Sequence, residues 1–329
     1  MARRQADLPQ AGVWLPPVLA DLFGQPGQCG PRQAAIALMQ FPPGIDGPRH
    51  GDRNGAVGID VPLARPSPHA RDLPWRTAFT WLRAGWCDLW THPLPSLIYG
   101  LGVFLVSVAV VWFLFHLEFD YALFPALAGF MVVGPLIAGG LYEKSRRLEA
   151  GEPVSLGPML FVRLRSGRAG VFMGVMLLGL FLLWMRAAVL IYALFFGMVA
   201  FPGTEEIVPM LLLTPTGWAL LLVGSAVGAL FAAFSFAISV FAFPMLLTER
   251  TDALSALGIS MAMVWNNFGV MIAWGAIVVA LFALCLLTAG LGLILVFPLL
   301  GHATWHCYRA IRSDDAAAHE DDRMFIRPT

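Results

Sequence analysis

The chain has 329 residues, of which 58% are hydrophobic and 13% charged, and its mean hydropathy is +0.72. About a quarter of the residues of a soluble domain are charged, so these values exclude an ordinary water-soluble protein and indicate an integral membrane protein. The net charge is +0. The chain as a whole therefore lacks the basic field that attracts nucleic acid, and we expect no nucleic-acid partner.

Residues 1–73 differ from the rest of the chain. They contain eleven of the 24 prolines, much glycine and scattered charge, without a sustained hydrophobic period. This composition predicts a Pro/Gly-rich, mostly disordered N-terminal region. A transmembrane domain is expected over 74–312, followed by a polar tail over 313–329.

Six apolar runs follow the N-terminal region, each long enough to cross a hydrocarbon core of about 30 Å. They lie near 97–117, 121–142, 170–201, 217–247, 268–288 and 290–308. The last two are nearly continuous, and we divide them at Thr288-Ala289-Gly290. The sequence therefore predicts an all-α membrane protein with six transmembrane helices.

Positive residues are unevenly divided between the connecting segments. The loops at 116–120 and 201–206 contain no lysine or arginine, whereas segment 143–169 carries Lys144, Arg146, Arg147, Arg163, Arg165 and Arg168. Because positive residues stay on the cytoplasmic side, both termini are expected inside, in a multi-pass protein of the bacterial inner membrane. The six residues are either an anchor with local ion pairs or a docking surface for anionic lipid or a cytoplasmic partner.

A threefold repeat underlies the predicted spans. A short amphipathic stretch precedes each odd-numbered span, and the apolar stripes at 79–89, 156–164 and 254–265 predict helices lying in the cytoplasmic interface. Each even-numbered span contains a proline in a similar local sequence, and these are Pro135, Pro244 and Pro298. Proline kinks a helix and frees the carbonyl four residues earlier, here those of Met131, Val240 and Ile294. We therefore predict three kinked hairpins, each preceded by an interfacial helix.

Four longer stretches resemble a known family. They are WLRAGWCDLWTHPLPSLIYG at 81–100, GPLIAGGLYEKSRRLEAGEP at 134–153, LLWMRAAVLIYALFFG at 182–197 and FPMLLTERTDALSA at 243–256. The chain is similar over roughly 75–325 to uncharacterised bacterial six-helix integral membrane proteins, a family filed as a domain of unknown function. The resemblance implies a membrane fold and no established chemistry.

Some members of that family carry automated names borrowed from respiratory oxidase subunits. A haem-copper oxidase core needs about six histidines inside the bilayer, and this chain has seven in total. Of these, only His116, His302 and His306 lie near a predicted span. The chain is therefore not expected to be that catalytic subunit, although an accessory role beside such a complex is compatible with it.

Arg186 is the most unusual residue of the predicted spans, because it lies about midway along the third. An ionised group at this depth is costly and usually marks a function or a buried pairing. Three interpretations are open. Arg186 is a hydrogen-bond hub bound to serines 107, 225, 235 or 239 or to the freed carbonyls, a site for a substrate or lipid headgroup, or a contact with another subunit.

His302 and His306 are spaced i, i+4, which places both imidazoles on one face of a helix and permits metal binding. No acidic third ligand lies nearby in the sequence, so an interfacial polar pair is the alternative. No cofactor is expected. No GxSxG, HExxH, P-loop or GxGxxG motif occurs in a plausible setting.

Three functional hypotheses follow, of which the third and least favoured is a membrane enzyme that acts on lipid. The first is a non-enzymatic accessory, scaffold or assembly subunit of an inner-membrane complex, with a respiratory oxidase or supercomplex as the named partner. The second is a small-solute or ion transporter that uses Arg186 as an intramembrane counter-charge. Transporters often break their helices near the midplane, whereas these prolines lie toward the inner ends, which favours the first hypothesis.

Overall fold

A computed structural model of the chain describes residues 69–71, 73–119, 122–164, 167–197 and 204–325. This part of the chain is helical and contains no strand. Its helices are α3 (Thr77–Trp90), α4 (Pro93–His116), α5 (Leu123–Ile137), α6 (Gly139–Ala150), α7 (Leu156–Leu160), α8 (Gly167–Phe196), α9 (Thr204–Leu213), α10 (Pro215–Ser239), α11 (Ala242–Thr248), α12 (Ala253–Asn266), α13 (Phe268–Leu287) and α14 (Leu293–Phe325). The predicted disordered region lies almost wholly outside the described residues, and α14 continues into the predicted tail.

Five helical segments of the described chain are long and apolar enough to cross a membrane. They are Pro93–His116, Pro125–Ala150, Gly167–Phe196, Pro215–Thr248 and Phe268–Leu287, which match the first five predicted spans. The sixth predicted span falls in α14, where eight mostly apolar residues lead into polar ones, so the six-helix count stays a prediction, as does the orientation. The predicted boundary at 288–290 is confirmed, because α13 ends at Leu287 and Gly290 has a φ of 85°.

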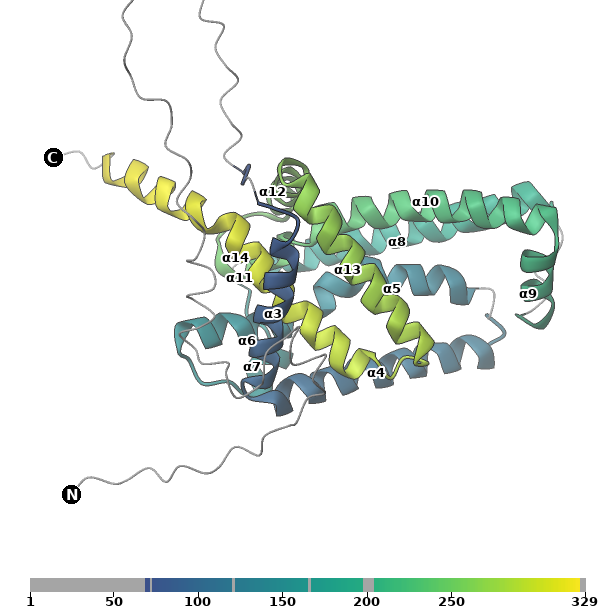
Figure 1. The fold of residues 1–329 in the computed structure, drawn as a ribbon, viewed down its shortest axis with the longest axis horizontal. Helices are drawn as coiled ribbons and strands as arrows, with labels where there is room; N and C mark the ends of the chain where they lie inside the picture. Colours follow the sequence, from purple (N-terminus) through teal and green to yellow (C-terminus); the bar gives the residue numbers. More distant parts are fainter. Residues whose placement is uncertain (1–68, 72, 120–121, 165–166, 198–203, 326–329) are drawn as a thin grey trace, which may run out of the picture.

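The helices divide into two groups. One contains α5, α8 and α10, and the other contains α3, α4 and α14. Figure 1 shows α8 and α10 running side by side along one edge and α4 along the opposite edge, with α13 and α14 crossing obliquely between them. α5 packs against α8 and α10, whereas α4 packs against α14 rather than closely against α5. The end that carries α3, α6 and α12 is called the basic end below, and it is the end predicted to face the cytoplasm.

The helix backbone breaks near two of the three prolines. α5 ends at Ile137, two residues after Pro135. The Ile137 carbonyl accepts a hydrogen bond from the Tyr99 hydroxyl at 2.5 Å. α10 ends at Ser239 before Pro244. At this break the Ser260 hydroxyl accepts from the Phe241 N–H at 3.2 Å and donates to the carbonyl of residue 237 at 2.8 Å. Backbone groups freed inside a membrane need such partners.

The third proline does not break its helix, since α14 runs continuously through Pro298. The carbonyl that Pro298 frees, that of Ile294, instead abuts Gly100 of α4, where a Cβ would collide with it. Only a glycine permits this approach of two helix backbones. The predicted freed carbonyl therefore lies at the α4–α14 contact.

Helices do form at the predicted amphipathic stretches, and the predicted stripes are confirmed in part: in α3, Leu82, Trp86 and Leu89 are buried. In α3, Trp81 is fully buried, whereas the predicted stripe residue Phe79 is 51% exposed. α7 is only five residues long, and Trp265 of α12 is 74% exposed. Trp81 is buried because it lies one turn before Gly85, on the face of α3 that packs against the backbone of Ala303 in α14.

Candidate functional site: a buried polar network and an apolar groove

Five polar side chains meet inside the basic end, where α3, α4, α6 and α14 converge. They are Asp88 of α3, Ser96 of α4, Lys144 and Ser145 of α6, and His302 of α14, and none is more than 7% exposed. The Lys144 Nζ donates to Ser96 Oγ at 2.8 Å and to the His92 carbonyl at 2.9 Å. Ser96 Oγ lies 2.9 Å from His302 Nε2.

The bonds continue on the other side of the imidazole. His302 Nδ1 lies 2.9 Å from Ser145 Oγ, which donates to Asp88 Oδ2 at 2.6 Å. A serine hydroxyl has one proton, and that of Ser145 is used on Asp88, so Ser145 accepts from His302 Nδ1–H. Ser96 accepts from Lys144 and donates to His302 Nε2. Counting donors therefore assigns His302 as the neutral Nδ1–H tautomer, and one directed chain of bonds links the Lys144 ammonium to the Asp88 carboxylate.

His306 extends the network one turn along α14. Its Nε2 lies 2.9 Å from Asp88 Oδ2, and its Nδ1 lies 4.0 Å from Glu149 Oε1. Burial by itself raises the pKa of the Asp88 carboxyl, but the His306 imidazole and the hydrogen bonds from His306 and Ser145 outweigh it and hold that pKa below its usual value. Asp88 is therefore the ionised acceptor at the end of the chain of hydrogen bonds.

The prediction of Lys144 as a cytoplasmic docking residue was wrong, because its side chain is fully buried and binds inward. Arg146 and Arg147 also form ion pairs within the chain. Their guanidinium groups lie 2.8 Å and 2.6 Å from the carboxylate of Glu143, and both also approach Glu152. The charges after the second span thus form one buried network and one ion-paired surface, as the anchor interpretation expected for the arginines.

The remaining basic candidates lie beside this region. Arg163 and Arg168 are exposed, and no hydrogen bond or ion pair of either is found within the described ranges. Arg165 lies outside the described residues. A docking role for Arg163 and Arg168 stays a prediction.

The structure brings His302 and His306 together on one face of α14, as the spacing predicted, but it surrounds them with serines and a carboxylate. Both nitrogens of His302 are engaged with hydroxyls. Within the described ranges, no group of three or more His, Cys, Asp or Glu side chains has a geometry suited to a metal ion. The pair therefore serves the polar network rather than the predicted metal site.

Arg186 of α8 is exposed. It belongs to an outward stripe in which Leu182, Leu183, Val189 and Leu190 are 54, 58, 47 and 64% exposed. Within the described ranges no hydrogen bond or ion pair of Arg186 is found, and Ser107 and Ser239, two of its predicted partners, donate to carbonyls of their own helices. The predicted intramolecular hub is therefore absent from this part of the chain.

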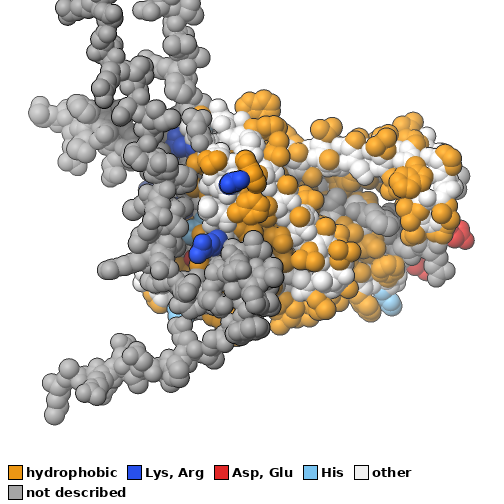
Figure 2. Space-filling view, in the orientation of Figure 1, with side chains coloured by type: hydrophobic (Ala, Val, Ile, Leu, Met, Phe, Trp, Pro, Cys, Tyr) orange, Lys and Arg blue, Asp and Glu red, His pale blue; other side chains and the backbone are white. Residues whose placement is uncertain are grey.

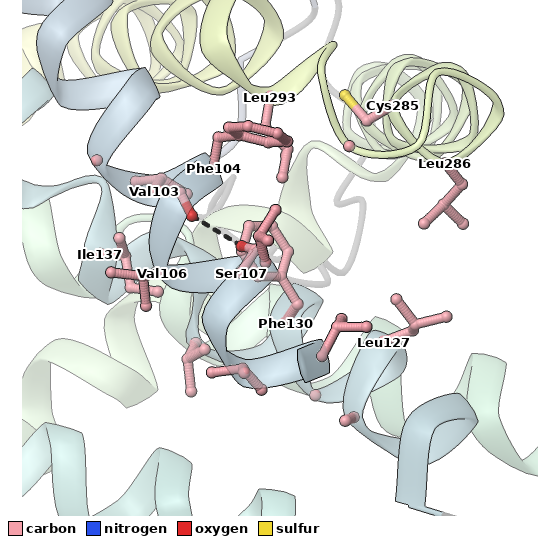
Figure 3. A pocket seen from close by; sticks show the side chains of 18 of the residues that line it. Val103, Phe104, Val106, Ser107, Leu127, Phe130, Ile137, Cys285, Leu286 and Leu293 are labelled. Carbon is pink, nitrogen blue, oxygen red and sulfur yellow. Dashed lines mark hydrogen bonds between the residues drawn. The ribbon is translucent and has the colours of Figure 1, made fainter. Parts of the chain in front are cut away.

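A groove with a volume of about 1220 Å³ lies between α4 and α5 and is closed at its back by α13. Its lining is almost wholly apolar. The two hydroxyls in it, of Tyr99 and Ser107, donate to the Ile137 and Val103 carbonyls, and Figure 3 shows the Ser107 bond among the surrounding apolar side chains. Val106 on its wall is 64% exposed, so the groove opens sideways, and both hydroxyls of its lining are already bonded to backbone carbonyls.

The outer surface agrees with a membrane protein. In Figure 2 hydrophobic side chains are spread over the part of the molecule where α8, α10 and α13 lie, and lysine and arginine side chains are seen only toward the basic end. This part of the surface is therefore the part suited to contact with lipid.

Sequence reasoning missed Asp88, Ser96 and Ser145. One signal was available, because Asp88 lies in the tryptophan-rich stretch AGWCDLW, where a lone carboxylate on a helix implies a buried partner. The groove had no such signal, since every residue in it also suits lipid contact.

Comparison with known proteins supports the membrane assignment. Residues 123–248 match the model of a family described as "Predicted integral membrane protein (DUF2189)", whose function is unknown. The match covers α5 to α11, which is less than the predicted 75–325 and leaves out the 81–100 stretch. No curated protein and no solved structure matches. The region from Leu123 to Thr248 is thus similar to a family of predicted integral membrane proteins.

Proposed function

We propose that this protein is a non-enzymatic accessory subunit that holds a transmembrane helix of a larger complex of the bacterial inner membrane in the groove between α4 and α5. The groove is the observation that carries the proposal. The partner complex we propose is a respiratory oxidase assembly, which rests on the sequence resemblance alone.

The length of the groove favours a helix as its occupant. The lining residues of α4 extend from Ile98 to Phe115, and seventeen steps of 1.5 Å make about 26 Å along the helix axis. This is close to the full hydrocarbon thickness of about 30 Å. A lipid acyl chain occupies one leaflet, about half of that depth, whereas a transmembrane helix crosses both.

The polar network supports a structural rather than a catalytic role. Its hydroxyls, the Lys144 ammonium and both nitrogens of His302 are engaged with other groups of the same chain, and the network lies inside the basic end instead of in the groove. The His306 Nδ1, which has no hydrogen-bond partner among the described residues, is buried. An enzyme keeps at least one such group available to its substrate. The transporter alternative gains no support, because its counter-charge, Arg186, lies on the outer face of α8.

Filling the groove tests the proposal. A Cβ at Gly102 meets nothing within 4 Å, and Gly102 lines the groove, so Gly102→Leu narrows it without a clash in the free protein. Gly275 of α13 is equally open but does not line the groove, and Gly275→Leu is the matched control. We expect the wild type and the control to retain a companion subunit through mild-detergent purification, and Gly102→Leu to lose at least about tenfold of it.

Three results would contradict the proposal. Recovery of the wild-type protein as a lone monomer is the first. Equal retention in Gly102→Leu and Gly275→Leu is the second. The third is a photo-crosslinker at Val106 that labels only lipid, which would identify the groove as a lipid site.

A further inference from the structure

We propose that the exposed face of α8 around Arg186 binds a transmembrane helix of another polypeptide that carries an aspartate or glutamate near the middle of the bilayer. The inference deepens the proposed function by naming the chemistry of a partner. It rests on that function only in requiring a membrane partner, because it concerns a different face of the molecule.

The depth of Arg186 follows from the helix that carries it. Phe196, the last residue of α8, is ten residues further along, which makes about 15 Å at 1.5 Å per residue. Gly167, the first residue, is nineteen residues back and about 28 Å away. Because the hydrocarbon core is about 30 Å thick, either end is further than one arginine side chain can reach. Snorkelling to a headgroup therefore leaves the guanidinium in a largely apolar region.

Within the part of the chain that the structure describes, the surroundings of Arg186 offer no group that compensates its charge. Its neighbours at i−4, i−3, i+3 and i+4 are Leu182, Leu183, Val189 and Leu190, all exposed. None of α4, α5, α8, α10, α11 and α13 contains an aspartate or glutamate, and α14 has none before Asp314. An arginine at the centre of a transmembrane helix is costly to insert, and a carboxylate from outside the chain would offset this cost with a bidentate ion pair.

The same composition argues against a second copy as the partner. The apolar helices of this chain have no carboxylate to offer at that depth. Two copies packed through this face would bring two arginines together, which is repulsive. The partner is therefore a different polypeptide.

The Arg186 face is separate from the groove. Phe181 of the same helix lines the groove, and Arg186 is five residues further along. At 100° per residue this places the two side chains about 140° apart around the helix. A helix held in the groove does not reach Arg186, so the two faces are testable independently.

Photo-crosslinking in native membranes tests the inference. Benzoylphenylalanine is placed at Leu183 or Leu190, beside Arg186 and exposed, in otherwise wild-type, Arg186→Leu and Arg186→Lys chains. We expect an adduct with a second polypeptide that mass spectrometry shows to carry an aspartate or glutamate within an apolar helix. Its yield falls at least about tenfold in Arg186→Leu, since losing one partner of a desolvated ion pair costs 2 kcal/mol or more. Arg186→Lys retains most of it.

A charge exchange completes the test. Arg186→Asp abolishes the adduct, and replacing the partner's carboxylate residue by arginine restores it. Adducts confined to lipid, adducts with a second copy, a partner without such a carboxylate, or an unchanged yield in Arg186→Leu would each overturn the inference. Arg186→Leu removes a charge from a lipid-facing position, and an unchanged melting temperature in detergent shows that it is folded.

Failure of the inference is distinguishable from failure of the proposed function. The same crosslinker at Val106 reports on the groove. A polypeptide adduct at Val106 with none at Leu183 or Leu190 overturns the inference alone. The reverse pattern overturns the groove proposal and leaves the inference standing.

Discussion

Replacing Lys144 by methionine tests whether the buried network stabilises the fold. Methionine has a similar volume, so the substitution leaves little cavity but removes the two close hydrogen bonds of Nζ, to His92 and Ser96. Bonds of a charged donor contribute about 1.5 to 3 kcal/mol each, and removing one member of a buried charge pair costs about 3 to 5 kcal/mol. We therefore expect Lys144→Met to lower the free energy of unfolding by about 3 kcal/mol. For a domain of this size, that corresponds to a melting temperature about 6 to 12 °C lower.

The assay is thermal unfolding in detergent, followed by intrinsic tryptophan fluorescence. Arg168→Met is the matched control, because Arg168 is exposed and has no partner within the described ranges. A surface substitution changes stability by about 0.5 kcal/mol or less, so we expect its melting temperature within about 2 °C of the wild type. If Lys144→Met melts as late as Arg168→Met, the network contributes nothing and the reasoning is refuted.

Three further predictions follow from single contacts. The lowered pKa of Asp88 means that its stabilisation is complete above its unfolded value of about 3.8 and is lost as the pH falls through the lower folded value, so on acidification from about pH 4 to 2 the melting temperature should fall more in the wild type than in Asp88→Asn. Ser260→Ala leaves the Phe241 N–H without its partner at the α10–α11 break and should cost about 1 to 3 kcal/mol, read as a lower melting temperature; an unchanged value would contradict this. Gly100→Ala should destabilise α4 by colliding with α14, whereas Gly102→Ala, two residues on and facing open space, should not; equal melting temperatures would refute the close approach.

The helical plan was predictable because its signal is local. An apolar run of about twenty residues is sufficient to identify a span, and a Thr-Ala-Gly sequence sufficed to divide the last two at residues 288–290. The buried face of α3 was predictable only in part, because Leu82, Trp86 and Leu89 are buried as the stripe predicts and Phe79 is not. Its choice of Trp81 over Phe79 depends on the contact between Gly85 and Ala303, residues that lie more than two hundred positions apart.

In the candidate site, too, features with a local sequence signal were predictable and features that depend on distant contacts were not. The i, i+4 spacing of His302 and His306 correctly placed both on one face, but the chemistry of that face comes from α3, α4 and α6. Lys144 follows an apolar run in a burst of charge, and the local pattern therefore predicts a water-exposed anchor. Only the convergence of four helices shows that its side chain turns inward to Ser96.

The network and the groove are linked through α4. The residues of this helix that are buried are Ser96, Gly100 and Val103, all in its first three turns. Ser96 receives the Lys144 bond, and Gly100 carries the close contact with α14. Beyond Val103 the helix forms the wall of the groove without buried residues of its own. Because α4 is fixed at one end and open along the rest, the network sets the position of that wall. Under the proposed function, the network would therefore act by fixing the groove wall, which is consistent with a lysine and an aspartate that are buried away from the groove.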